Sequence, residues 1–567
     1  MSEFFRELAQ IFRGDRRQQW GAIALTLVIC LGILLRFVNL DSKVVWIDEI
    51  HSFMRVGGYG KTALVEQFEQ TIAATETRPG TLMPLEDLLQ LQRPPVSQNL
   101  LTGLGATIHA LATDNPQHPP VYYLAARLMA GIFGPGVSIL RGTAAFFGVA
   151  LIPAMGWLAW VLWRSPHISL VTMAIAAVSP FQIAYAQEAR EYSLLAAMVA
   201  LTTGLLVRAM DGTRRGWWTY GGAIAVGFYT HLLMGYVVVA HGVMVLAVQG
   251  WRSPVARRFG LAIAGAVATF VPWIVVYLIY FRGMGWIGRD LGFVGLLRRW
   301  AVGWTLPIFD LQILYADQLF DVAAVQDLTN LGWGWGLIAL CGGLWGWSAW
   351  KLWRGARRSA FVVTALGWVP FLMLALPDVV DGGQRSTVGR FLMPVVLSLQ
   401  MTLGYALGNA FKPSSRAGIS SSTLTKITLV VIVMLGVGST VGSGRSPVGW
   451  NKYTSYYDPA VADILVSGDT PLIITGAEKN GRLMSIAHYL PPLKTQPLKT
   501  AVSPTVLFIA KPAVPALPAD LTQRFTNIYL YRPYAELVNG LQAQGWQLET
   551  IHAPGQLIQA TPPNHDA

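Results

Sequence analysis

Two adjacent carboxylates open a long polar segment of this chain, Trp46-Ile-Asp-Glu-Ile-His51, shortly after an apolar run over residues 20–38. Neighbouring residues of a helix do not share a face, so we expect Asp48 and Glu49 to have different roles. A carboxylate works as a general base when it lies within hydrogen-bond reach of the proton that it removes. The alternative is structural, since an Asp that precedes a helical run is a good N-cap.

Two further polar segments interrupt apolar sequence. His118 stands before Pro119 and Pro120, which are favoured in the first turn of a helix, so it either starts a helix or contacts an anionic head group. Gln187-Glu-Ala-Arg190 lies in a short turn between two apolar runs, where charges are costly unless they are paired or face a wet cavity. Arg190 offers a planar fork to a phosphate or to Glu188, and a purely architectural pair is the alternative.

Single charged residues also mark the ends of apolar runs. His231 ends one run, and Arg390 begins another directly after a polar loop. An arginine in that position either binds an anion or snorkels to the membrane surface. Asp48, Glu49, His51 and His118 offer oxygen and nitrogen atoms to a divalent metal, but no ligand spacing such as His-x-x-x-His is present. We therefore expect no cofactor, with a divalent metal as the alternative.

The elements that carry these residues are those of a membrane protein. The 567 residues are 53% hydrophobic and only 13% charged, whereas about a quarter of a soluble protein is charged. Apolar runs of roughly 17–25 residues, each enough to cross about 30 Å of hydrocarbon, recur along the chain. The net charge of +12 comes from short basic clusters between these runs, which set orientation, so we expect no nucleic-acid partner. Cys30 and Cys341 lie inside apolar runs and form no disulfide framework.

Placing the basic clusters in the cytoplasm predicts eleven spans, the first and the last both running outward. The predicted spans are 18–38, 139–163, 168–186, 191–209, 217–233, 235–250, 259–280, 331–350, 359–376, 389–410 and 427–442. Residues 119–133 are left over. Because they are short and contain Arg127, we expect a helix at the outer interface with Arg127 snorkelling; if they span instead, every later helix inverts.

The predicted fold class is an all-α polytopic membrane protein of about 11 transmembrane helices with a small C-terminal extracytoplasmic α/β domain. We expect a transmembrane domain over residues 1–443, with interfacial helices in its outer loop 39–138, and a soluble domain over 444–567. A second outer region, 281–330, mixes Trp and Arg residues as interfacial segments do. Strand-like runs in the soluble domain are Pro471–Thr475, Thr505–Ala510 and Asn527–Tyr531.

Taken together, these segments resemble the polyprenyl-phosphate-dependent membrane glycosyltransferases of the GT-C class, which include protein O-mannosyltransferases and aminoarabinose transferases. Each matching motif is short, but their order, spacing and shared outer location form a fairly specific combination. The motifs are Trp46-Ile-Asp-Glu49, His118-Pro-Pro-Val-Tyr-Tyr123, Leu140-Arg141, Ser179-Pro-Phe-Gln-Ile-Ala-Tyr-Ala-Gln-Glu-Ala-Arg-Glu-Tyr192, Tyr229-Thr-His231 and Gly389-Arg-Phe-Leu-Met-Pro394.

The resemblance implies an inverting transfer of one sugar, a hexose or a pentose, from a polyprenyl-phosphate donor to a hydroxyl of a lipid, glycan or protein acceptor on the periplasmic side. The resemblance implies that Asp48 is the base and that Glu49 supports it. It also implies that His118 binds the donor phosphate, at a position where some relatives have lysine. The remaining residues implied for donor phosphate and sugar binding are Tyr122, Glu188, Arg190, Tyr192, His231 and Arg390.

Two other classes of function compete with this interpretation. A transporter or lipid flippase would use charged residues of the outer face as a substrate site, and would place polar residues at mid-membrane in two repeated halves. An assembly or anchoring protein would have its function in the C-terminal domain, which leaves the costly Gln187–Arg190 turn unexplained. The sequence has no Gly-rich phosphate loop, in agreement with a lipid-linked donor. We expect an integral protein of a bacterial inner membrane, surrounded by membrane lipids.

Overall fold

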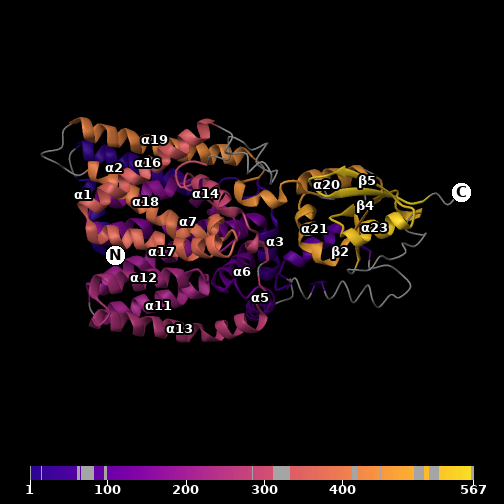
Figure 1. The fold of residues 1–567 in the computed structure, drawn as a ribbon, viewed down its shortest axis with the longest axis horizontal. Coiled ribbons are helices and arrows are strands. Elements are labelled where there is room, and N and C mark those ends of the chain that lie inside the picture. The colour runs from indigo at the N-terminus through magenta and orange to yellow at the C-terminus, as the bar shows by residue number, and fades with distance from the viewer. Residues whose placement is uncertain are drawn as a thin grey trace. The chain divides into compact units, whose positions relative to one another are not determined.

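The chain folds into two compact units, shown as a ribbon of the computed structural model in Figure 1. The structure describes residues 2–13, 16–60, 64–65, 82–94, 99–212, 214–283, 285–310, 332–411, 419–446, 448–490, 504–509 and 523–563. The first unit, called the helical unit, comprises Met1–Ser42, Asn115–Ala125 and Val137–Asn451. The second, called the mixed unit, comprises Lys43–Asp114, Ala126–Gly136 and Lys452–Ala567.

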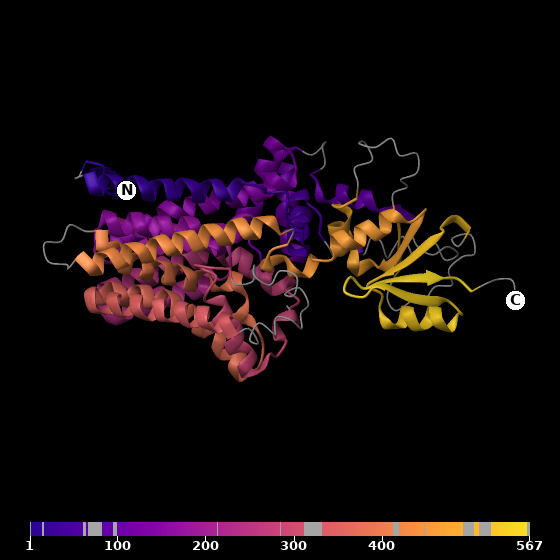
Figure 2. The ribbon, with the colours of Figure 1, turned by 90° about the horizontal axis from the view of Figure 1, so that it is seen from above.

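Long apolar helices build the helical unit and run roughly parallel to one another, as α2 and α19 do in Figure 2. The helices are α1 (Ser2–Ile11), α2 (Arg16–Phe37), α7 (Val137–Trp163), α8 (Pro166–Val178), α9 (Pro180–Ala186), α10 (Tyr192–Met210), α11 (Arg214–Thr230), α12 (Met234–Gln249), α13 (Pro254–Tyr280), α14 (Gly292–Gly303), α16 (Gly332–Gly355), α17 (Arg357–Val380), α18 (Met393–Gly408) and α19 (Ile419–Arg445). Seven helices in the described part of the chain are long and apolar enough to cross a membrane, or eight if the bent pair α8–α9 is one span.

Every predicted span coincides with a helix or with the α8–α9 pair, so the polytopic helical architecture is confirmed. The chain is an integral membrane protein. The total of eleven spans stays a prediction, because α11, α12 and α16 are not among the helices of the described chain that are long and apolar enough to cross a membrane. Residues 311–330 of the second predicted outer region lie outside the described residues.

Small residues let the central helices approach closely. A methyl group added to Gly404 in α18 would lie 2.1 Å from Oγ1 of Thr172 in α8. One added to Gly32 in α2 would lie 2.4 Å from the carbonyl oxygen of Ala177. Both distances are far inside van der Waals contact, so these helix crossings need glycine, as is common where packing rather than water exclusion holds helices together.

A break between α8 and α9 turns the chain by 59°. Pro180 is the cause, because proline has no N–H to continue the helix and disfavours helical geometry at the preceding Ser179. The freed carbonyls have a fixed partner in Arg36, which is fully buried. Its Nη1 donates to the freed carbonyl of Ala177 at 2.6 Å, and its Nη2 donates to that of Ala176 at 3.0 Å. Nη1 also donates to the carbonyl of Gly32 in its own helix α2 at 2.6 Å. The break therefore has a defined geometry.

The mixed unit combines the first long polar loop of the chain with the C-terminal residues. Its sheet has the order β1-β3-β2-β4-β6-β5, with β2 parallel to both neighbours and the other pairs antiparallel. Its elements are α3 (Ile47–Gly57), β1 (Leu82–Pro84), η1 (Leu85–Gln92), α5 (Leu100–Asp114), α20 (Asp458–Ser467), β2 (Pro471–Gly476), α21 (Asn480–Ala487), β3 (Thr505–Ile509), β4 (Asn527–Tyr531), α23 (Ala535–Ala543), β5 (Gln547–His552) and β6 (Leu557–Thr561), with η8 (Trp450–Ser455) leading into it.

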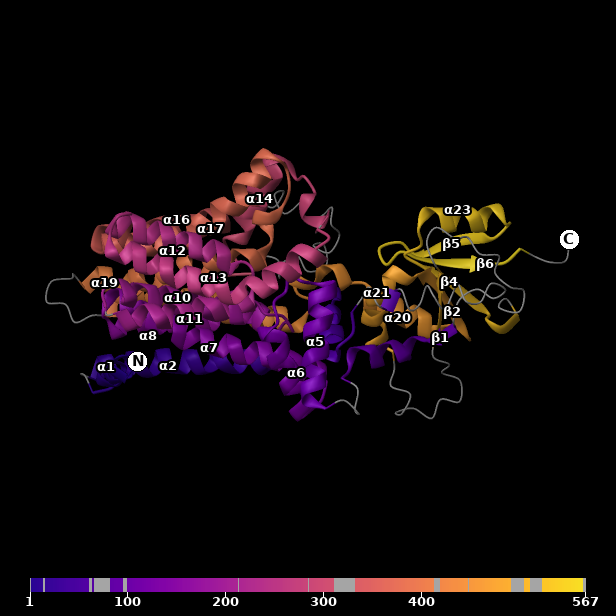
Figure 3. The ribbon, with the colours of Figure 1, turned by 90° about the horizontal axis from the view of Figure 1, so that it is seen from below.

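The three predicted strands are confirmed as β2, β3 and β4. Strand β2 is buried at every position, as expected for a central parallel strand with both faces covered. Helix α23 lies along one side of the sheet in Figure 3, where Leu537 and Leu541 pack against Leu472 and Leu530. The small α/β region of the predicted fold class is therefore present.

The first polar loop contributes to this sheet. Strand β1 pairs antiparallel with β3, from Leu82 opposite Leu507 to Pro84 opposite Thr505. Sequence patterns did not predict β1, because three residues are too few for an alternating pattern. The structure thus groups Lys43–Asp114 with the C-terminal residues in one unit. A domain boundary after residue 443, and the interfacial position of the loop helices, stay predictions.

Arg127 differs from expectation. It lies in α6 (Val121–Phe133), and snorkelling was wrong for its side chain, because only 4% of the residue is exposed. Its Nη1 donates to the carbonyl of Val56, and Gly103 leaves room for the guanidinium, since a methyl group there would clash with Nη2 at 2.3 Å. Arg127 therefore stabilises the mixed unit by bonding to the last turn of α3.

Candidate active site

The turn between α9 and α10 is the centre of the candidate site. Gln187 fixes its first residue, because the side-chain Nε2 donates to the carbonyls of Leu35 and Val38 at 2.8 and 3.1 Å at the end of α2. The next four residues are buried, although three of them are charged. Burying charges is costly without partners, so the contacts of this turn show how the cost is offset.

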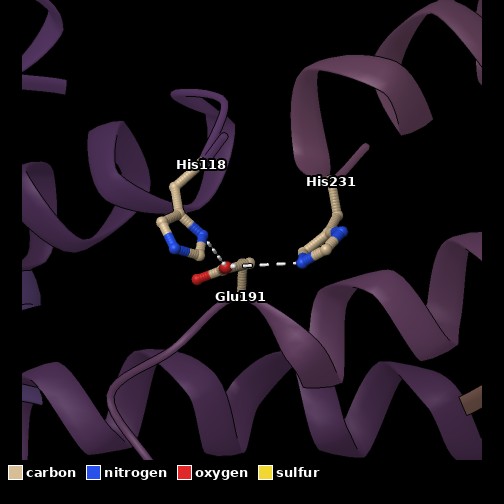
Figure 4. A group of neighbouring side chains, drawn as sticks. All are labelled: His118, Glu191 and His231. Carbon is tan, nitrogen blue, oxygen red and sulfur yellow. Dashed lines mark hydrogen bonds and ion pairs between the residues drawn. The ribbon is translucent and has the colours of Figure 1, made fainter. Parts of the chain in front are cut away.

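Glu191 lies between the two histidines of the cluster drawn in Figure 4. The carboxylate is fully buried, and Oε1 lies 2.7 Å from Nδ1 of His118 and 3.8 Å from Nε2 of His231. Oε2 accepts a hydrogen bond from the Tyr123 hydroxyl at 3.0 Å and lies 3.6 Å from Nε of Arg190. The cation Arg190 and the donors His118 and Tyr123 surround this carboxylate, and such contacts favour its charged form. Glu191 is therefore ionised.

The hydrogen bonds assign a tautomer to His118. The short contact of Nδ1 with the Glu191 carboxylate makes Nδ1 the donor, because an ionised carboxylate only accepts. Nε2 then keeps its lone pair and accepts from Nη2 of Arg190 at 3.1 Å. A neutral imidazole meets both contacts, so His118 connects Glu191 to Arg190.

His231 follows α11 and is also neutral. Its Nδ1 accepts a hydrogen bond from the backbone N–H of Leu233 at 3.0 Å, which leaves the neutral ring with its proton on Nε2, on the side of Glu191. His231 is a neutral neighbour of Glu191.

Two arginines lie beside the ring of Tyr192, the first residue of α10. The guanidinium carbon of Arg190 is 5.5 Å from the ring centroid and that of Arg390 is 5.9 Å away, both within the range of a cation–π contact. Nη2 of Arg190 also donates to the Tyr192 hydroxyl at 3.2 Å. Because guanidinium forks match phosphate oxygens in geometry, this pair is the part of the cluster best suited to a phosphate.

A buried aspartate orders the loop that carries Arg390. Asp378, near the end of α17, accepts hydrogen bonds from the backbone and the hydroxyl of Ser386 at 2.6 and 2.7 Å. It also accepts one from Arg385 at 3.0 Å, and Trp300 donates to the Ser386 hydroxyl at 3.0 Å. These bonds fix residues 385–387 just before η6 (Gly389–Leu392), which begins with Gly389 and Arg390.

Two other predicted residues have separate partners in the helical unit. Glu188 is fully buried and accepts a hydrogen bond from Asn451 Nδ2 at 2.6 Å. The hydroxyl of Tyr122 donates to the backbone carbonyl of Leu140 at 3.2 Å, whereas Tyr123 reaches Glu191. Adjacent helical residues point about 100° apart, so only one of these two tyrosines faces the carboxylate.

Asp48 and Glu49 belong to the mixed unit and have different surroundings, as predicted for neighbours on a helix. Trp46 is the N-cap of α3, so Asp48 stands in the first turn and does not cap the helix. Glu49 is fully buried and accepts a hydrogen bond from Lys452 at 2.8 Å. Of the pair, only Asp48 is partly exposed.

One set of side chains has the composition of a metal site. Among the described residues, His118, Glu191 and His231 bring three ligand atoms within 4.8 Å of one another, and two His with one Glu is a known zinc set. Both nitrogens of His118 already have partners, however, and one partner is the cation Arg190. Of the ligands that the sequence offered, Glu49 is bonded to Lys452. The chemistry of these groups fits a hydrogen-bonded ion cluster better than a divalent ion.

Comparison with known proteins gives this arrangement a family context. Residues 117–276 match the family model described as dolichyl-phosphate-mannose-protein mannosyltransferase. The fold matches that of ArnT from Cupriavidus metallidurans in the apo state, with a TM-score of 0.50 and 12% sequence identity over 96% of this chain and 98% of that one. The resemblance to the GT-C glycosyltransferases is thereby confirmed.

Other solved structures of GT-C enzymes are also similar. They include ArnT from the same organism bound to undecaprenyl phosphate, with a TM-score of 0.49 and 12% identity over 94% of this chain and 97% of that one. The oligosaccharyltransferase AglB from Archaeoglobus fulgidus, in complex with an inhibitory peptide and a dolichol-phosphate, has a TM-score of 0.46 and 11% identity over 98% of this chain and 75% of that one. No curated protein sequence matches the chain.

Of the predicted site residues, the structure brings together His118, Arg190, Tyr192, His231 and Arg390. Glu188 instead accepts a hydrogen bond from Asn451, the last residue of the helical unit. Sequence reasoning gave no role to Glu191, Tyr123, Asn451 or Lys452. Glu191 belongs to a motif that the sequence analysis discusses, but a single sequence does not show whether Glu188 or Glu191 contacts the other charged residues. Asn451 and Lys452 left only a weak signal, a polar pair inside the aromatic stretch Trp450–Tyr453.

Proposed function

We propose that this chain transfers a single sugar from a polyprenyl-phosphate donor to a hydroxyl of a lipid, glycan or protein acceptor, with inversion at the anomeric carbon. The observation that carries this proposal is the pair Arg190 and Arg390 beside Tyr192, with Arg190 held by the buried Glu191 and His118. Preorganised cations of this kind lower the barrier for departure of a phosphate, because they meet charge that grows in the transition state.

The proposed reaction needs one base. The Asp48 carboxylate takes the proton of the acceptor hydroxyl, and the acceptor oxygen forms a bond to the anomeric carbon. The bond between that carbon and the phosphate oxygen breaks, and the polyprenyl phosphate leaves with the electron pair. Arg190 and Arg390 stabilise this leaving group, while His118 orients Arg190, a change from the direct phosphate contact expected from sequence.

We propose that Glu188, Tyr192 and His231 also contact the donor, and that Glu49 has a supporting role.

No cofactor enters this mechanism, so dialysis against EDTA should leave the rate of transfer unchanged. Purified protein should contain well below one equivalent of zinc. Stoichiometric zinc that is lost in His231→Ala would overturn the metal-free proposal.

The test is reconstitution of the full chain with a panel of polyprenyl-phosphate sugars and a cell-envelope extract, with mass spectrometry of both products. Wild-type protein should add one sugar mass and release polyprenyl phosphate. Asp48→Asn should lower the rate by about 10²–10⁴-fold, the usual contribution of a general base, with unchanged expression and melting temperature. Asp41→Asn, at an exposed site on the same chain segment, is the matched control. Substantial turnover by the Asp48 variant would rule out this base.

A transporter or flippase is the second candidate, and one observation favours it. Broken apolar helices such as α8–α9 recur at the substrate sites of transporters. Here Arg36 binds the carbonyls that the break frees. Movement of a fluorescent polyprenyl-phosphate sugar across liposomes by wild type and by Asp48→Asn alike, with no transfer, would support the transporter.

We propose that the active side faces the periplasm of a bacterial inner membrane. Ser386, a natural first choice for a reporter cysteine in this loop, is fully buried, whereas Asp381 is exposed. After replacement of Cys30 and Cys341, Asp381→Cys should react with an impermeant thiol reagent added to intact spheroplasts. Reaction only after lysis would invert the proposed orientation.

A further inference from the structure

The first turn of α21 in the mixed unit contains a buried amide without partners. Asn480 is 0% exposed, and within the described part of the chain neither Oδ1 nor Nδ2 has a hydrogen-bond partner. Leaving such a group unsatisfied costs about 1–3 kcal/mol, so buried polar side chains nearly always have a partner. A buried amide with neither atom bonded can donate to and accept from a polar group that reaches it.

This turn packs directly on the first turn of α3, where Asp48 stands. A methyl group on Gly481 would lie 2.8 Å from Cδ1 of Ile47 and 3.3 Å from Nε2 of His51. The two turns therefore lie in close contact at Gly481, beside Ile47, which precedes Asp48 in the chain. Asn480 and Arg482 are the neighbours of Gly481 in the first turn of α21.

Arg482 adds a cation to the same place. Its Nη1 donates to the carbonyl of Thr454, whose own hydroxyl oxygen is buried and has no hydrogen-bond partner among the residues described. Burial and the nearby charge of Arg532 lower the pKa of Arg482, whereas Asp458 and Asp48 act in the opposite direction. Arg482 therefore lies within electrostatic range of Asp48, and a guanidinium in that position is suited to an oxyanion of a substrate.

Arg532 has an unusual backbone as well. Its φ of 46° is in the left-handed region, which is costly for a residue other than glycine. The backbone N–H donates to the carbonyl of Gln556 at 2.8 Å, and Nε donates to the Tyr531 hydroxyl at 3.2 Å. These contacts hold the side chain at the end of β4 in a fixed direction.

We propose that Asn480, Arg482 and Arg532 form the acceptor-binding site, and that the acceptor carries an oxyanion, a phosphate or a carboxylate, near the hydroxyl that receives the sugar. The arginines bind the oxyanion, the Asn480 amide binds a neutral hydroxyl, and the reacting hydroxyl meets Asp48. This inference rests on the proposed function, because Asp48 defines the position of the reacting group.

The first experiment separates acceptor binding from donor binding. The full chain in nanodiscs is assayed with a polyprenyl-phosphate sugar, while the amount of envelope extract is varied. Asn480→Ala, Arg482→Gln and Arg532→Gln should each raise the KM for the extract about tenfold or more, and leave the KM for the donor within twofold. Asn539→Ala and Arg524→Gln, at exposed positions of the same unit, are matched controls.

Arg532 is partly exposed, so its variant tests the site even if the buried Asn480 variant fails to fold. The second experiment identifies the oxyanion. The extract is either treated to hydrolyse phosphate esters or amidated at its carboxylates. Loss of acceptor capacity after one treatment identifies that group, and full capacity after both would refute an anionic acceptor.

The two proposals fail in different ways. Absence of transfer by wild type, or an active Asp48→Asn variant, would overturn the proposed function. Normal transfer by wild type and an inactive Asp48 variant, combined with unchanged acceptor KM in the Arg482 and Arg532 variants, would overturn only the acceptor site.

Discussion

The carboxylate of Glu191 and the imidazole of His118 form a hydrogen bond of 2.7 Å in the helical unit, and the carboxylate is completely removed from solvent. Through His118 and by direct contact at 3.6 Å, Glu191 holds Arg190. One buried anion thus orients the side chain that we assign to the donor phosphate.

Glu191→Gln tests whether the Glu191 carboxylate stabilises Arg190. The substitution keeps the shape but leaves Arg190 without its nearest counter-charge, a change that typically costs about 3–5 kcal/mol for a buried pair. We expect a lower melting temperature, partly restored by undecaprenyl phosphate because its phosphate replaces the missing anion. Differential scanning fluorimetry of purified protein measures both effects. The exposed Glu549→Gln should change neither, and a Glu191 variant as stable as wild type would show that Arg190 does not need this carboxylate.

The Glu49–Lys452 pair tests whether burial, rather than the N–O distance, decides how much an ion pair contributes to stability. Its N–O distance is 2.8 Å with both side chains almost fully buried, whereas Arg358 and Asp211 pair at 2.7 Å with more than half of each side chain exposed. Glu49→Gln or Lys452→Met alone should cost about 3–5 kcal/mol, because each leaves a buried charge. The double variant should recover part of this loss in a double-mutant cycle.

The matched exposed pair sets the scale for that cycle. Asp211→Asn should cost no more than about 1 kcal/mol, as is usual for surface ion pairs. Equal losses at the two sites would mean that burial does not decide the strength of the Glu49 contact.

Asp458 should make the stability of the protein depend on pH. Ser485 has one hydroxyl proton but lies 2.5 Å from the carbonyl of Val45 and 2.6 Å from Oδ2 of Asp458, so a protonated Asp458 supplies the second hydrogen. Burial raises the pKa of Asp458 in agreement with this. A raised folded-state pKa contributes stability below the unfolded pKa, and that stability is lost as pH rises through the folded value.

Thermal melts from pH 4 to pH 9 measure this dependence. Asp458→Asn, which is neutral at all pH values, should match wild type in acid and equal or exceed it at pH 9. A variant less stable than wild type at pH 9 would show that the ionised carboxylate is the favourable form.

Arg36 should control both stability and catalysis through the break at Pro180. Arg36→Met removes the side-chain donor for the two carbonyls that the break frees, those of Ala176 and Ala177, and each costs about 1–3 kcal/mol if left unsatisfied in the interior. We expect a lower melting temperature and a lower kcat, because the turn at residues 187–191 follows the break. Arg358→Met, at an exposed position, is the control. A variant with wild-type kcat would show that the turn keeps its geometry without Arg36.

The sequence by itself determined the class of the protein and most of its helices. Apolar runs long enough to cross a bilayer appear in one dimension, as do the cationic clusters between them. It also separated Asp48 from Glu49, because the helical period places neighbours on different faces. The strands β2, β3 and β4 were visible as short apolar runs between polar segments.

Only the tertiary structure decided which charged groups meet. Glu191 is bonded to His118, Tyr123 and Arg190, and Glu49 to Lys452. The energy of these contacts depends on distances between residues far apart in the chain and on the removal of water, and neither is encoded in a local pattern. The same reason explains why Tyr123 rather than Tyr122 reaches Glu191, and why β1 joined a sheet formed by residues some 400 positions later.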